Sequence, residues 1–111
     1  MQKFLVLFLA PPAVLDEWMK TPQEERDAEE KKMREDWDVW MEAHRSAIKE
    51  TNAGGKTKKV TKQGVEDTRN DIMLYSVVEA ESHEIASKIF ESHPHLSIPQ
   101  SSIEVMAIRG M

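Results

Sequence analysis

The sequence predicts an α+β domain with the element order β-α-β-β-α-β and a four-stranded antiparallel sheet. Two segments, Phe4–Leu9 and Asp71–Ala80, are apolar on both alternating faces, as central strands are. Between them, apolar residues recur with the helical period of about 3.6 residues. At 111 residues, the chain is expected to form one domain, residues 1–111, around a single core.

The composition limits the classes of partner. A net charge of -5 argues against nucleic acid, because phosphate binding needs a concentrated basic surface. The apolar segment Phe4–Ala10 could be the core of a signal peptide, but its length is minimal and prolines follow at once. No stretch approaches the roughly 20 apolar residues that cross a bilayer. The lack of cysteine permits a reducing compartment, so we expect a cytoplasmic protein without membrane contact.

The first half of the chain is dominated by one long helical pattern. Val14–Met19 is a short helix candidate, and Thr21 with Pro22 resembles a helix start. From Pro22 to about Thr51 nothing interrupts the helix, so we expect one helix over this range. Its apolar stripe comprises Met33, Trp37, Trp40, Met41, His44 and Ile48.

Glycines should end this helix and return the chain to the sheet. After Gly54 and Gly55, the segment Lys56–Gln63 alternates like a strand and carries lysine throughout, which is typical of an exposed sheet edge. We therefore expect it to form the second strand of the sheet. Gly64–Asn70 is expected to be a loop.

The C-terminal part predicts a second helix and the last strand. Ser82 can cap a helix that continues to Ser92, with a loop bounded by Pro94 and Pro99 after it. Ser102–Arg109 alternates as the final strand. The helix should bury Ile85, Ala86, Ile89 and Phe90.

These elements fit the ferredoxin-like arrangement, in which the first and third strands are central and the second and fourth lie at the edges. Two helices cover only one face of a four-stranded sheet. The other apolar face then needs a cover, and the simplest is the same face of a second copy. The alternative is that the overhang of the long first helix covers it.

Three segments of the chain carry a recognisable pattern: "KFLVLFLAP", "MLYSVVEAESHEIASKIFESHP" and "SSIEVMAI". In these segments, with Glu81-Ser82, His93-Pro94 and Glu104-Val105 at the motif positions, the chain resembles the YCII-related, DGPF-like group of the dimeric α+β barrel superfamily. The Asp-Gly-Pro-Phe signature is absent, and only Gly64 remains of it. The resemblance implies a homodimer whose sheets pair as a dimeric α+β barrel. Some members are proposed to be enzymes that use a His/Asp pair, for which His44 and Glu81 are the nearest candidates here.

His44 is the main candidate for acid–base chemistry, because it lies on the same stripe as two tryptophans. A partly desolvated imidazole can act as a base near neutral pH or orient an acidic ligand. The alternative is a histidine that hydrogen-bonds at the edge of the core and has no chemical role.

The pair His93 and His95 brackets Pro94 and permits two interpretations. A His-x-His segment can bind a metal, but no third ligand is evident, so we expect no metal site. The segment is also explained as the exit of a helix stopped by proline. In this topology Asp67 and Arg69 should lie at the same sheet end, so the four residues could form a pocket rim.

Tryptophans are the remaining candidates for a ligand site. Trp37 and Trp40, with Trp18, could line a cleft for a flat apolar molecule, or they could simply be core residues. No nucleophile elbow, phosphate loop or dinucleotide fingerprint is present, and no cofactor is expected. Two functions stay open: a homodimer that binds a small molecule between helix and sheet, or a cofactor-free enzyme that uses histidine acid–base chemistry.

Overall fold

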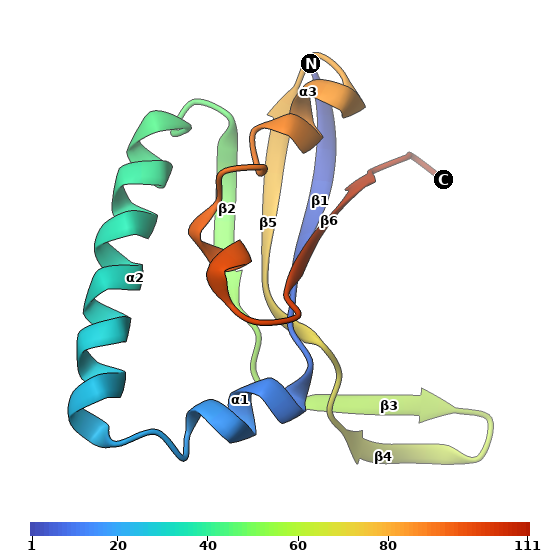
Figure 1. The fold of residues 1–111 in the computed structure, drawn as a ribbon. Coiled ribbons are helices and arrows are strands. Elements are labelled where there is room, and N and C mark those ends of the chain that lie inside the picture. The colour runs from blue at the N-terminus through green and yellow to red at the C-terminus, as the bar shows by residue number, and fades with distance from the viewer.

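The computed structural model describes residues 1–111 and has the predicted α+β architecture (Figure 1). The chain forms ten elements in two sheets and a helical layer. In chain order they are β1 (Gln2–Leu9), α1 (Pro12–Trp18), α2 (Gln23–Ala43), β2 (Ile48–Ala53), β3 (Thr57–Thr61), β4 (Gly64–Thr68), β5 (Ile72–Ala80), α3 (His83–Lys88), the 3₁₀ helix η1 (Pro94–Ser97) and β6 (Ser102–Ala107).

The main sheet has the ferredoxin-like strand order β2-β5-β1-β6, with every neighbouring pair antiparallel. The two doubly apolar segments, β1 and β5, are central, as predicted. They pair over their whole length, from Gln2 opposite Ala80 to Leu9 opposite Ile72, with one irregularity before Leu9. Omitting the β3–β4 hairpin, the order is β-α-β-β-α-β, so the predicted fold class is confirmed.

The core lies between the sheet and one helical layer. Alternate residues of β1, Phe4, Val6 and Phe8, are fully buried and face α2 and α3. Trp40 of α2 packs on Phe90, with ring centroids 5.1 Å apart, and its Nε1 donates to the carbonyl of Ile89. Because α2 and α3 share this face, the alternative in which α2 covers the opposite face is wrong.

The first long helix is shorter than predicted. It ends at Ala43, not near Thr51, and the chain then enters β2, which pairs with β5 as an edge strand. Ile48 therefore belongs to the sheet, where it lies opposite Val78. Pairing with a central strand overrides the helical period here, and Thr51 supports it through a 2.7 Å hydrogen bond to the buried Ser76 hydroxyl.

The lysine-rich segment is not an edge of the main sheet. β3 pairs only with β4, which falls within the predicted loop, and the two strands form a separate hairpin. At its base the N–H of Gly54 donates to Met73 O, and a Cβ there would meet that oxygen at 3.1 Å. At its tip Gly64 has a φ of +129°, a backbone conformation that favours glycine.

Only one of the two predicted N-terminal helix caps is found in the structure. The Ser82 side chain accepts from the N–H of Ile85, so the predicted cap of α3 is confirmed. The helix itself ends at Lys88, and Ile85 is exposed rather than buried. Pro22, not Thr21, is the cap residue of α2, and no side chain caps this helix.

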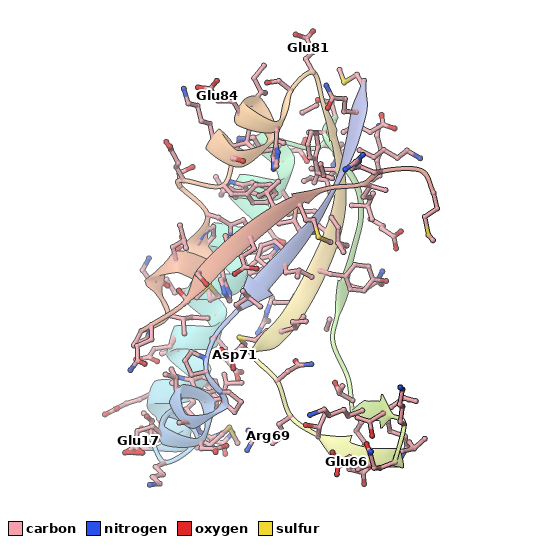
Figure 2. The ribbon with its side chains drawn as sticks, turned by 90° about the vertical axis from the view of Figure 1, so that its right-hand side faces the viewer. Glu17, Glu66, Arg69, Asp71, Glu81 and Glu84 are labelled. Atoms are coloured by element: carbon pink, nitrogen blue, oxygen red, sulfur yellow. The ribbon has the colours of Figure 1, made fainter.

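The second face of the sheet is not covered by this chain. Leu5, Leu7 and Leu9 point to this face and are half-buried, whereas the residues between them are sealed in the core. Their neighbours on β5 are Tyr75 and Val77. We call this surface the open face. Figure 2 looks onto it from the side opposite α2.

Candidate functional site

The main candidate site is a cleft of about 970 Å³ between α1, α2, the start of β5 and the segment 97–99. α2 contributes Met33 and Trp37 from its apolar stripe, and α1 contributes Trp18. The other apolar residues around it are Val14, Leu15, Met73, Leu74 and Ile98. Its volume lies within the range typical of ligand pockets, roughly 300–1,000 Å³.

Trp18 and Trp37 give this cleft two large aromatic surfaces. The Trp18 Nε1 donates to a carboxylate oxygen of Glu29 at 2.9 Å, which links α1 to α2. Trp37 packs against Phe8 and His93, with ring centroids 5.7 Å and 4.3 Å away. One indole is thus held by a hydrogen bond between helices and the other by the core, so both are positioned before any ligand enters.

Charged side chains surround the apolar part of the cleft. Four acidic residues and two basic ones line it: Glu29, Glu30, Asp36, Asp38, Lys32 and Arg34. Lys32 is paired with Asp36 at 2.9 Å, with both side chains largely exposed. The polar groups therefore lie towards solvent, and an apolar ligand body would contact the tryptophans.

His93 lies behind Trp37 in an aromatic environment and is 3% exposed. Its ring also neighbours Trp40 and Phe8, at 4.5 Å and 5.0 Å. Nδ1 accepts from the N–H of His95, so the neutral ring carries its proton on Nε2, which has no hydrogen-bond partner. Burial, with smaller effects of His95 and His44, lowers the pKa of His93 to about 4.

His95 fastens η1 to the end of β1. Its Nε2 donates to Leu9 O at 2.9 Å, and the side chain is completely buried. Nδ1 is then an acceptor without a partner. Burial lowers the pKa of His95, opposed by backbone hydrogen bonds of Leu9 and Ser102. The segment is therefore a helix exit whose two histidines are tied into the core.

The expected rim of His93, His95, Asp67 and Arg69 does not form. The histidines are sealed in the core because the neutral rings pack against aromatics. Asp67 and Arg69 instead line a second, more exposed pocket of about 550 Å³ between α1 and the base of the β3–β4 hairpin. There Arg69 makes two hydrogen bonds to Asp16, of 3.1 and 3.2 Å, which lower the pKa of that carboxyl.

His44 caps the end of α2 and lines neither of these pockets. Its Nδ1 hydrogen-bonds to Trp40 O at 2.9 Å, and the two rings lie 4.3 Å apart. Glu81 is exposed, and Figure 2 shows it pointing away from the molecule at the end of the sheet opposite Arg69. No hydrogen bond or ion pair joins His44 to Glu81.

Sequence reasoning found the tryptophans of the cleft but missed several residues that complete it. Leu15, Met73 and Ile98 come from three separate segments, and no local pattern marks them as neighbours. Trp40, the other predicted ligand residue, is buried in the core. No group of three or more histidine, aspartate or glutamate side chains is arranged to hold a metal ion. None of the helices has the length and apolar character needed to cross a membrane.

Together, these elements form an α+β domain with a ferredoxin-like, four-stranded antiparallel sheet and a cleft beside α1 and α2. No protein-family model and no curated protein matches the chain. Among solved structures it is similar to 5-chloro-2-hydroxyhydroquinone dehydrochlorinase from Burkholderia phenoliruptrix AC1100, in complex with 2,5-dihydroxybenzoquinone. The TM-score is 0.52 with 12% identity, covering 100% of this chain and 94% of the other. At this identity the likeness shows the fold alone.

Proposed function

We propose that this protein is a homodimer that binds a small, flat and largely apolar molecule in the cleft between α1, α2 and the sheet. The observation that carries this proposal is the pair of held indoles, Trp18 and Trp37, facing a cleft of about 970 Å³. Aromatic side chains favour flat ligands through stacking and edge-to-face contact. The solved neighbour holds a flat quinone, which guides the choice of probe.

The homodimer part of the proposal rests on the open face. Leu5, Leu7 and Leu9 of β1 and Tyr75 and Val77 of β5 form one continuous half-exposed apolar surface. Burial of such a surface is worth roughly 25 cal/mol per Å². In a homodimer, the open face of one copy can pack on the open face of the other, so this surface supports the pairing of two sheets.

Membership of the YCII-related group is part of the same proposal. A cytoplasmic location stays an expectation from the sequence.

The binding test uses a neutral fluorescent probe and two matched arginine substitutions on α2. N-phenyl-1-naphthylamine gains fluorescence in apolar sites, and 2,5-dihydroxybenzoquinone serves as the competitor. Met33→Arg places a charge inside the cleft, whereas Val39→Arg places it on the solvent side of α2, where Val39 is 73% exposed. We expect Met33→Arg to weaken probe binding at least tenfold and Val39→Arg to leave it unchanged. Equal affinity in both variants would place the probe elsewhere and refute the cleft.

The alternative function, a cofactor-free enzyme, is supported by the tautomer of His44. The carbonyl of Trp40 can only accept, so Nδ1 carries the proton and Nε2 is free to take one from a ligand. We favour binding, because His44 lines neither pocket. The test is chloride release from a chlorinated hydroquinone. If His44 is the base, His44→Gln should lower turnover about 100-fold or more without changing the fold or the dimer. A turnover rate that His44→Gln leaves unchanged would eliminate His44 as the base, and a native protein that releases no chloride would eliminate this activity.

A further inference from the structure

The β3–β4 hairpin, residues Thr57–Thr68, forms an arm that stands away from the body of the protein (Figure 1). Its two strands pair with each other, and no hydrogen bond links residues 57–68 to another element. In Figure 1 the arm extends to the side of the sheet opposite α2, which is the side of the open face. An isolated two-stranded hairpin is only marginally stable in water, so this arm needs a surface to pack on.

The apolar residues of the arm are exposed. Val60 and Val65 are directly paired across the hairpin, yet they are 75% and 64% exposed. A cross-strand valine pair stabilises a hairpin when it is buried and gains little when it faces water. The pair is therefore a small apolar contact surface that nothing in the same chain covers.

The charge of the arm is opposite to that of the remaining chain. Residues 57–68 hold three of the 15 basic residues and two of the 20 acidic ones, which leaves 12 basic and 18 acidic residues elsewhere. Lys56, Lys59 and Lys62 take part in none of the ion pairs of the structure. The surface that complements this arm is acidic, and the body of a second copy is such a surface.

The length of the arm suits this partner. Five residues per strand extend roughly 17 Å at the rise of an antiparallel strand, and two packed sheets lie about 10 Å apart. An arm that leaves the sheet on the open-face side is thus long enough to reach a second copy whose sheet is paired on that face. We propose that the arm grips a second copy of this chain, with Val60 and Val65 packed on it and Lys59 and Lys62 paired with its carboxylates. This inference rests on the proposed homodimer.

The test compares two double charge reversals by sedimentation equilibrium. Lys59→Glu/Lys62→Glu changes the arm, and Arg45→Glu/Lys88→Glu makes the same charge change on the helical side of the body, at exposed positions. We expect the arm variant to raise the dimer dissociation constant at least tenfold at low salt, with the effect reduced in 0.5 M salt, and the control to change it less than twofold. Circular dichroism should show both variants folded, because the arm contributes no core residue.

Zero-length carbodiimide cross-linking of mixed ¹⁴N and ¹⁵N protein supplies the second measurement. We expect Lys59 or Lys62 to cross-link to an acidic peptide of the opposite isotope. An arm variant that dimerises like the native protein, or cross-links confined to one isotope, would overturn the arm contact and leave the sheet-to-sheet dimer standing. A native protein that stays monomeric at every concentration would overturn both.

Discussion

The burial of His93 predicts that the folded protein loses stability in mild acid. Its ring is sealed among Trp37, Trp40 and Phe8, and burial lowers its pKa from 6.5 to about 4. Between these two pKa values the unfolded chain binds more protons than the folded one. The free energy of unfolding must therefore fall as the pH decreases from 6.5 towards 4, and the contribution is fully present above 6.5.

The magnitude follows from the two pKa values. With 6.5 in the unfolded chain and about 4 in the folded protein, proton linkage from His93 removes roughly 2 kcal/mol between pH 7 and pH 5. The lowered pKa of His95 adds a loss of the same sign. A change of this size is a large fraction of the stability of a small domain, about 5–15 kcal/mol.

Urea unfolding followed by circular dichroism at pH 7, 6 and 5, at one protein concentration, measures this loss. His93→Asn keeps an acceptor for the N–H of His95 but cannot titrate, so its stability should depend less on pH by roughly 2 kcal/mol over this range. The control is Val39→Ala, which changes an exposed side chain of α2 and no titratable group and should retain the native slope. If His93→Asn loses as much stability as the native protein, the acid sensitivity arises elsewhere and the reasoning fails.

Three further predictions concern stability, and urea unfolding measures each of them. Ser82→Ala removes the cap of α3 and should cost about 1 kcal/mol, whereas Ser82→Asp should restore most of it. Thr51→Val leaves the buried Ser76 hydroxyl unpaired and should cost about 1–2 kcal/mol, unlike Thr51→Ser; equal costs would mean that lost packing dominates. Lys58→Ala and Lys62→Ala should each change stability by less than about 0.5 kcal/mol, because both side chains are exposed; a larger loss would show that the arm supports the fold of the subunit.

The arrangement of the sheet could be predicted because burial leaves a direct mark on a strand. β1 and β5 are apolar on both faces, a pattern that is typical of central strands covered on both sides. The Ser82 cap could also be predicted, because its hydrogen-bond partner, the N–H of Ile85, is only three residues away in the sequence. The positions of Trp18 and Trp37 in a cleft followed from the helical stripe only in part, because the cleft also needs α1 and the turn after η1.

The placement of the histidines could not be derived from the sequence. His93 and His95 are polar residues beside a proline, a pattern typical of an exposed loop. Their burial depends on Leu9, which is 86 residues from His95 and supplies the carbonyl that satisfies Nε2. Such a long-range partner has no local signal, so a rim shared with Asp67 and Arg69 was a reasonable but wrong expectation.

The position at which α2 ends explains both the main error in the predicted fold and the arm on which the further inference rests. The sequence 44–51 continues a helical pattern, but as an edge strand this segment pairs with the free side of β5 and lets Thr51 hydrogen-bond to Ser76. Once Ile48–Ala53 occupies the edge, the lysine-rich segment that follows has no place in the main sheet and must pair with itself as β3–β4. The lysines that would have protected a sheet edge then lie on an arm beside the open face. Because α2 ends about two helical turns earlier than predicted, the lysines do not protect a sheet edge from pairing with other chains. They lie instead on the arm that we propose contacts a second copy.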